Sequence, residues 1–192
     1  MSINNQKVID LCKKQKGLVL YTTDQGQWIA TGAAVYPFLC EQQLSPATLR
    51  AVYSIPEEVN IREEKQLPNL FNFEDVEEGE KPAVYEPIQL SPIGGAICLK
   101  TRDGVKFVDP KYLKPLEAGK NGESVLYERA SVGGYVYIVA KQGMMAEAII
   151  MPAQGVITEG WLDDLAMLLE DMRQTFEKEG KYDRRCERTG LL

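Results

Sequence analysis

The chain has 192 residues, a formal net charge of −6, four cysteines and no histidine. This length allows one domain with a sizeable core, and 44% apolar and 26% charged residues are ordinary values for a globular protein. Without histidine, a Ser–His–Asp triad, a Cys–His pair and every imidazole metal ligand are excluded.

The cysteines and the N-terminal residues predict a reduced, cytoplasmic protein. Residues 1–16 are polar, with lysines where a signal peptide needs an apolar stretch, and no apolar run approaches the roughly 20 residues of a membrane span. We therefore expect no membrane contact. The cysteines are too far apart for a zinc knuckle or a redox CxxC motif, and we expect no metal or other cofactor. They are Cys12, Cys40, Cys98 and Cys186.

The first part of the chain predicts a helix followed by a hairpin. Residues 3–14 form the helix, and Gly17 ends it. Two β-prone runs, 18–22 and 27–31, flank a polar turn and form the hairpin. The helix has one apolar side, which consists of Val8, Ile9, Leu11 and Cys12.

A second helix is expected over residues 46–53. Ser45 can cap it, a proline suits its first turn, and Pro56 limits its end. Residues 57–92 contain several prolines and predict irregular chain around one or two short edge strands, for instance 83–90.

The negative charge is concentrated in residues 57–80. This acidic segment holds nine acidic and two basic residues, a net charge of −7, which leaves +1 for the rest of the chain. A solvated loop is its ordinary interpretation. The net charge therefore does not exclude a nucleic-acid partner.

The clearest pattern lies in residues 94–151 and is typical of an antiparallel meander with tight turns. An Asp-Gly pair predicts the first turn, and Asp109 is placed to cap a short helix. The glycine pairs at 94–95 and 133–134 lack the features of a phosphate-binding loop and are read as turns. The expected strands are 95–100, 105–108, 124–130, 135–141 and 144–151, and the expected helix is 111–116.

A long amphipathic helix is expected near the C-terminus, with Thr158 as its cap and Gly180 at its end. We expect it to pack on the core, although its Trp161 could instead mark an interface. Asp163 and Asp164 are neighbours on this helix and diverge by about 100°, so they do not converge on one ion. The apolar stripe consists of Trp161, Leu162, Leu165, Leu168, Leu169, Met172 and Phe176.

These elements predict an α+β fold in which an antiparallel sheet carries short helices and a long C-terminal helix. The expected parts are an N-terminal helix (1–16), a core domain (17–152) that includes the irregular segment 57–92, a C-terminal helix (153–180) and a loose tail (181–192).

Basic residues cluster around the short helix at 111–116. Lys111 and Lys114 are three residues apart, so a helix would place them on one face. Such a face could contact phosphates without sequence specificity, and ordinary solvated lysines are the alternative. The cluster consists of Lys100, Arg102, Lys106, Lys111, Lys114 and Lys120.

Residues 104–152 carry a family resemblance. The run GVKFVDPKYLKPL at 104–116 precedes a strand, a turn and a strand, and Ala-Ile-Ile-Met-Pro follows at 148–152. This order resembles the repeated β-α-β-β-β module of bacterial DNA sliding clamps. That family's helices line a ring and present basic residues to DNA, so the resemblance implies that Lys111 and Lys114 contact DNA.

The resemblance also implies that the helix at 46–53 belongs to a first, more divergent module. Residues 17–152 would then form one clamp-like domain, and ring closure would need several copies of the chain.

A second short motif, Gln66-Leu-Pro-Asn-Leu-Phe71, resembles the peptides with which proteins dock onto sliding clamps, although it has one residue too many. The alternative is a loop whose apolar residues pack on the core. The candidate partner-binding residues are Gln66, Leu67, Leu70, Phe71 and Trp161.

The sequence favours a non-enzymatic binding protein of bacterial or phage type. The first hypothesis is a clamp-like, DNA-associated accessory protein that self-associates or binds a protein partner. The second is an inhibitor or adaptor of a mobile element, which acts through its acidic segment or a helix face without nucleic acid. No catalytic residue is assigned, and an enzyme would require two converging carboxylates in a dry pocket.

Overall fold

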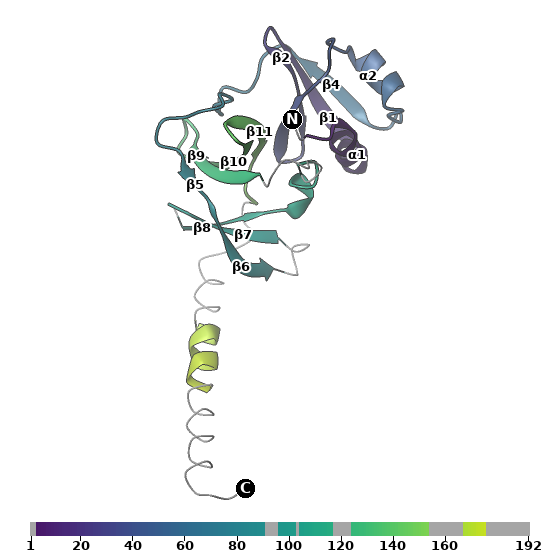
Figure 1. Cartoon of the computed structure of the whole chain (residues 1–192). Coiled ribbons are helices and arrows are strands. Elements are labelled where there is room, and N and C mark those ends of the chain that lie inside the picture. Colours follow the sequence, from purple (N-terminus) through teal and green to yellow (C-terminus); the bar gives the residue numbers. More distant parts are fainter. Residues whose placement is uncertain (1–2, 91–95, 103, 117–123, 154–166, 176–192) are drawn as a thin grey trace, which may run out of the picture. The chain divides into compact units, whose positions relative to one another are not determined.

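The computed structural model divides the chain into two units, residues 1–153 and 154–192, and each is described by itself. The first unit, the body, holds all the labelled helices and strands of Figure 1. The structure describes residues 3–90, 96–102, 104–116, 124–153 and 167–175.

The N-terminal half of the body contains the predicted helix, hairpin and second helix. The side chain of Asn4 caps α1 by accepting a hydrogen bond from the Lys7 amide, and Ser45 caps α2 in the same way through Thr48. The sequence does not predict β3 or β4. The elements are α1 (Asn5–Gln15), β1 (Gly17–Thr23), β2 (Gly26–Thr31), β3 (Ala34–Phe38), α2 (Pro46–Val52) and β4 (Asn60–Glu64).

The C-terminal half contains the expected meander, in which the predicted turns lie between β7 and β8 and between β9, β10 and β11. The expected edge strand at 83–90 is present as β6. The elements are β5 (Lys81–Pro82), β6 (Val84–Leu90), β7 (Ala96–Thr101), β8 (Gly104–Val108), η2 (Pro110–Tyr112), β9 (Val125–Ala130), β10 (Val136–Gln142) and β11 (Met145–Ile150).

The expected helix at 111–116 is instead a short 3-10 helix, η2, followed by turns up to Leu116. Asp109 caps it as predicted, because its side chain accepts a hydrogen bond from the Lys111 amide at 3.0 Å. Pro115 explains the short length. A proline there has no amide hydrogen and its ring clashes with the carbonyl four residues earlier, so an α-helix cannot continue through it.

The strands form an eight-stranded sheet and a three-stranded sheet. The large sheet has the order β4-β1-β2-β3-β11-β10-β9-β5, and the small one has the order β6-β7-β8. All pairs are antiparallel except β1 with β4. The α+β, antiparallel-rich class predicted from the sequence is confirmed.

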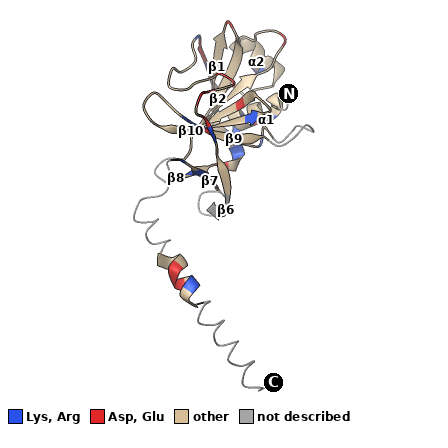
Figure 2. Ribbon diagram, turned by 60° about the vertical axis from the view of Figure 1, so that its left-hand side comes forward, with Lys and Arg blue, Asp and Glu red and all other residues tan. Residues whose placement is uncertain are grey.

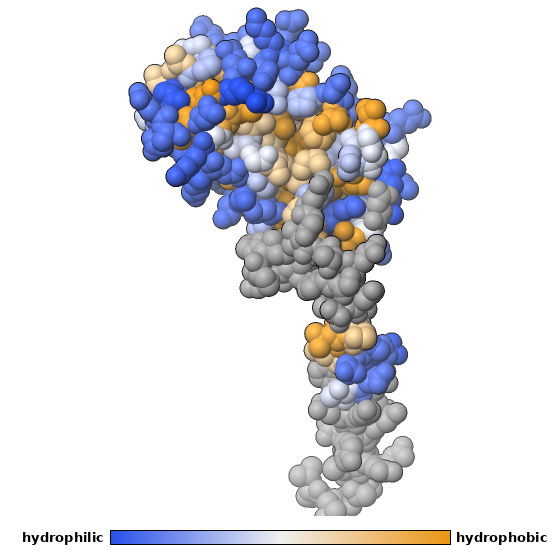
Figure 3. All heavy atoms as spheres, turned by 180° about the vertical axis from the view of Figure 1, so that it is seen from behind, coloured by the Kyte–Doolittle hydropathy of each residue, from blue (hydrophilic) through white to orange (hydrophobic). Residues whose placement is uncertain are grey.

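The core lies on both faces of the large sheet, because alternate residues of β10 and β11 enter different apolar clusters. Ile138 and Ile150 face the larger cluster, to which α1, α2, η2 and the small sheet contribute. Tyr137 and Ile149 face the smaller cluster, which Phe71 and Phe73 cover from the acidic segment. On the side shown in Figure 3, apolar side chains reach the surface of the body between hydrophilic borders.

The acidic segment therefore differs from a fully solvated loop. Residues 60–64 form β4, and the aromatic rings at 71 and 73 are half-buried on the sheet, while most of the carboxylates remain exposed. Residues 71–80 are called the acidic strap below. The strap combines a solvated acidic side with an apolar, anchored side.

The long C-terminal helix is not supported over its expected length. Residues 167–175 are helical, and their side chains are exposed. Residues 154–166, including Trp161, residues 176–180 and the expected tail at 181–192 lie outside the described residues. No helix in the described ranges has the length and apolar character needed to cross a membrane.

Candidate nucleic-acid interface

Helix α1 and the turn at 109–116 lie side by side, and three hydrogen bonds join them. The Asn4 amide donates to the carbonyl of Pro115 at 3.1 Å, and the Lys7 ammonium donates to the carbonyl of Lys114 at 3.2 Å. At the other end of α1, the side-chain amide of Gln15 donates to the Tyr112 hydroxyl at 3.2 Å. These bonds fix the two elements next to each other.

The turn is also tied to the sheet. The buried Tyr36 hydroxyl on β3 donates to the carbonyl of Tyr112 at 2.6 Å, and the Tyr112 hydroxyl accepts from the Ala33 amide at 3.2 Å. The aliphatic side chain of Leu113 enters the larger core cluster. Buried contacts with β3 and the core therefore fix the backbone that carries Lys111 and Lys114.

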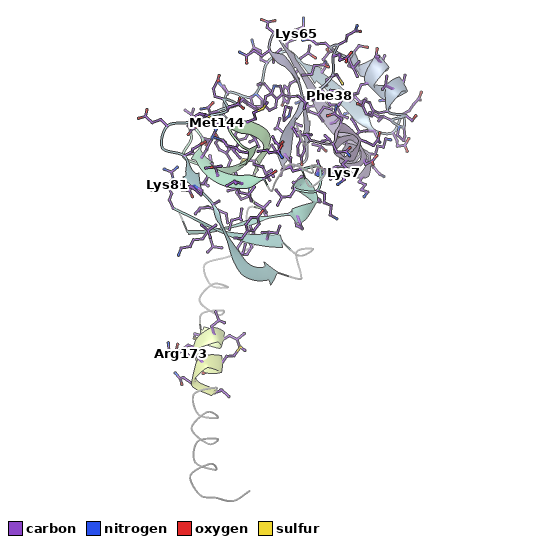
Figure 4. The ribbon with its side chains drawn as sticks, viewed as in Figure 1. Lys7, Phe38, Lys65, Lys81, Met144 and Arg173 are labelled. Carbon is purple, nitrogen blue, oxygen red and sulfur yellow. The ribbon has the colours of Figure 1, made fainter. Side chains whose placement is uncertain are left out.

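A basic groove of about 480 Å³ runs between α1 and this turn. Of the eight described residues that line it, four are lysines and one is an aspartate, so this lining carries an excess of positive charge. Figure 2 shows the blue of lysine and arginine gathered around α1, and Figure 4 labels Lys7 on this helix. The basic groove is lined by Lys7, Asp10, Leu11, Lys14, Gln15, Lys111, Lys114 and Pro115.

The helical period explains why α1 contributes two of the lysines. Lys7, Leu11 and Lys14 follow one another at four and three residues, which places them along one side of the helix. Val8, Ile9 and Cys12 turn toward the core and are buried. The helix thus has a buried side on the sheet and a basic side on the groove.

Lys111 differs from the other groove lysines because it has an acidic neighbour. Its ammonium lies 2.5 Å from the Asp109 carboxylate and 4.9 Å from the centre of the Tyr112 ring. The hydrogen bond to Asp109 raises the pKa of Lys111, partial burial opposes that shift, and Tyr112 adds to the rise. Lys111 is therefore a firmly protonated cation whose charge Asp109 partly offsets.

The structure separates the basic cluster that the sequence suggests. Lys111 and Lys114 line the basic groove, whereas Lys106 lies on β8 and does not. Arg102 is engaged elsewhere: its guanidinium lies 2.7 Å from the buried carboxylate of Glu128, which also accepts the Arg102 amide at 2.6 Å. Lys120 lies outside the described residues.

Sequence reasoning missed Lys7 and Lys14, which take the places in the groove that were expected for Lys106 and Arg102. Their spacing of seven residues on a predicted helix was the available signal. This spacing indicates a shared site only when α1 is known to lie beside the turn at 109–116. The contact between these two elements joins residues about 100 positions apart.

The predicted docking motif is only partly accessible. Gln66 and Leu70 are exposed, but the Phe71 ring packs edge-to-face on Tyr137, with 5.2 Å between the ring centres. The Phe71 ring also packs edge-to-face on the Phe73 ring, with 6.3 Å between the ring centres. Leu67 is half-buried and lines a separate cavity. This agrees with the alternative interpretation, a loop anchored on the core through apolar residues.

A second charged cluster joins the acidic strap to the sheet. Arg129 of β9 is fully buried, its guanidinium lies 2.7 Å from the Glu80 carboxylate, and Lys141 of β10 contacts the same carboxylate. Arg129 also donates to three backbone carbonyls of the strap, at 2.7 to 3.2 Å. Because this cluster is buried, we assign it to fold stability. Among the described residues, no group of three or more metal-ligating side chains is placed to hold an ion.

Comparisons with known proteins add no relative. No protein-family model matches the chain, and no curated protein or solved structure shows significant similarity to it.

Proposed function

We propose that this chain is a non-enzymatic, cytoplasmic binding protein that contacts the phosphate backbone of DNA through the basic groove. The observation that carries the proposal is the convergence of four lysines from two elements far apart in sequence. Phosphate contacts from lysine fix a protein on a duplex without reading its sequence. The groove offers ammonium groups from both elements, so it suits such contacts.

The arrangement of the strands supports a clamp-like interpretation of this binding. Helix α1 precedes β1–β3 in the way that η2 precedes β9–β11, and β3 pairs with β11 at the middle of the large sheet. Both helical elements contribute to the same apolar cluster, on one face of the sheet. The element in the first half that matches η2 is α1, because α2 follows the three strands. A ring would still require several copies of the chain.

The proposal is tested by fluorescence anisotropy with a labelled duplex at low ionic strength. We expect salt-sensitive binding, and we expect Lys111→Glu/Lys114→Glu to weaken it about tenfold or more, because two attractive charges become repulsive. The matched control is Lys65→Glu/Lys81→Glu. Both control lysines are exposed and lie outside the basic groove (Figure 4). Reversing their charges changes the total charge of the protein by the same amount as Lys111→Glu/Lys114→Glu does.

The proposal fails if the native protein shows no salt-dependent binding. It also fails if both double variants weaken binding equally, since total charge and not the groove would then govern the interaction.

The second candidate is a protein-interaction module that acts through the acidic segment without nucleic acid. The strap supports it, because Glu74, Asp75 and Glu78 are exposed on a segment that buried contacts hold in place. Deletion of residues 57–80 would also remove β4 and the cover of the smaller apolar cluster. Charge-changing point variants are therefore the appropriate test.

A further inference from the structure

A second cavity, which shares no described lining residue with the basic groove, opens between the strap and the sheet. Its volume is about 340 Å³. We call it the strap pocket. Residues from β2, β3, β11 and the strap all line it. The lining residues used in the argument are Trp28, Leu39, Phe73, Glu74, Asp75 and Met145.

The floor of the strap pocket is apolar. Trp28 and Phe73 pack edge-to-face, with 5.1 Å between ring centres and 75° between ring planes. Both rings also contact the smaller core cluster. Leu39 and Met145 complete the wall and are 36% and 46% exposed. An apolar side chain that entered the pocket would cover surface that water now contacts.

The rim of the strap pocket is acidic. Its exposed carboxylates are those of Glu74 and Asp75, whereas Glu147 also lines the pocket but is buried. No lysine or arginine is among the described residues that line it. Asp75 is held in place because its carboxylate accepts the Ala146 amide at 2.8 Å, and Glu147 accepts the Ser124 hydroxyl at 3.1 Å. Glu74 is exposed. This rim favours a cationic ligand.

One polar group in the pocket favours a peptide over a simple amphiphilic amine. The side-chain nitrogen of Gln142 is buried and has no hydrogen-bond partner among the described residues. Buried donors are normally satisfied, so a peptide carbonyl that reached this nitrogen would gain a hydrogen bond.

We propose that the strap pocket binds a peptide segment of a partner protein in which an apolar side chain is flanked by lysine or arginine. The apolar side chain occupies the floor beside Trp28 and Phe73, and the basic residues face Glu74 and Asp75. The site is separate from the basic groove, so the proposal does not depend on DNA binding.

The test uses three capped, fluorescein-labelled peptides and the full chain. The probe is Lys-Arg-Leu-Leu-Arg-Lys. The controls are Lys-Arg-Ser-Ser-Arg-Lys, which keeps the charge, and Glu-Asp-Leu-Leu-Asp-Glu, which keeps the apolar residues. We expect saturable binding of the first peptide and, for each control, affinity lower by about tenfold or more.

Two matched pairs of variants locate the binding. Glu74→Lys should weaken the first peptide about fivefold, while Glu78→Lys, an exposed strap residue outside the pocket, should not. Met145→Ser should weaken it about fivefold, while Met144→Ser, at the adjacent exposed position, should not. All four positions are exposed, so these variants should fold. Lys7→Glu/Lys114→Glu should keep peptide binding, which separates this test from the DNA test.

Three results would overturn the inference. Equal binding of the serine-containing peptide would show charge attraction alone. Equal effects within either matched pair would place the contact elsewhere. A concentration-dependent dimer that Met145→Ser abolishes would assign the strap pocket to a second copy of the chain.

Discussion

Arg129 is a large cation that lies wholly inside the protein, and its partners explain how the interior accommodates it. The carboxylates of Glu80 and Glu77 lie 2.7 and 3.8 Å from its guanidinium, Glu80 being shared with Lys141, and carbonyls of the strap accept its other hydrogen atoms. Without such partners, the free-energy cost of moving a charged guanidinium out of water would be too large for a stable fold. Loss of one partner from a buried ion pair commonly lowers the free energy of unfolding by about 3–5 kcal/mol. The ion pairs and hydrogen bonds of Arg129 therefore fix the position of the strap on the sheet.

Glu80 should make stability depend on acid pH. Partial desolvation alone would raise the pKa of Glu80, but hydrogen bonds and charges from Lys141 and Arg129 outweigh it and hold that pKa below its usual value. Its stabilisation is present above the unfolded-state pKa of about 4.3 and is lost as pH falls through the lower folded-state value. Glu80→Gln should lower the free energy of unfolding at pH 7 by about 3 kcal/mol.

Urea unfolding of the native protein and of Glu80→Gln between pH 7 and pH 3 measures this effect. The difference between their free energies of unfolding should shrink as the pH falls. Glu78→Gln is the control, since Glu78 is exposed, and it should match the native protein throughout. A constant difference between Glu80→Gln and the native protein would exclude the ionised pair as its cause.

The cysteines should differ in reactivity. Burial raises the pKa of the Cys12 thiol to about 12, although a hydrogen bond with Thr31 partly opposes the rise, and Cys98 is also buried. Cys40 is exposed. In a Cys186→Ser background at pH 7.5, iodoacetamide should label Cys40 about 100-fold faster than Cys12 or Cys98. Peptide mass spectrometry measures the rates, and rapid labelling of Cys12 without denaturant would contradict its position in the core.

At the scale of elements, the acidic strap acts as a cover for the second face of the sheet. Its aromatic residues pack on the smaller apolar cluster, its backbone carbonyls accept hydrogen bonds from Arg129, and the Asp75 carboxylate accepts one from the Ala146 amide of β11. The cover is needed because β10 and β11 carry apolar side chains on both faces.

Removal of one aromatic anchor should loosen this cover. Phe73→Ala should lower the free energy of unfolding by about 1–2 kcal/mol, since the ring is half-buried and pairs with Trp28. Hydrogen exchange at the Ala146 amide, which donates to Asp75, should accelerate. Val76→Ala, at an exposed strap position, is the control. Unchanged exchange at Ala146 in Phe73→Ala would show that the strap does not depend on this ring.

The sequence predicts those elements whose signals are local. The caps at Ser45 and Asp109 and the turn before β8 depend on neighbouring residues, and α1, α2 and the hairpins are present as expected. The expected helix at 111–116 is a short 3-10 helix, and the long C-terminal helix is not supported over its expected length. β3 is not predicted because Pro37 interrupts it; the proline is tolerated since β11 pairs only with Ala34 and Val35. β4 is not predicted because its side chains are mostly polar and its partner among the described strands, β1, is distant in sequence and parallel.

At the scale of the whole molecule, the two halves of the chain join through β3 and β11 and bring α1 beside the turn at 109–116. Lys111 and Lys114 could be identified from the sequence, because a short basic element was visible there. Lys7 and Lys14 could not, because their place in the groove depends on this long-range contact. Arg102 was misplaced because nothing local shows its pairing with the buried Glu128.

The central claim, that the basic groove contacts DNA phosphates, is tested most directly by the salt dependence of duplex binding. A plot of log affinity against log salt concentration should be linear with a negative slope. Lys7→Gln, Lys14→Gln and Lys114→Gln should each reduce its magnitude by about 0.9, the value for one lost phosphate contact on duplex DNA. Lys65→Gln and Lys81→Gln should leave the slope unchanged, and equal slopes for all five variants would contradict the claim.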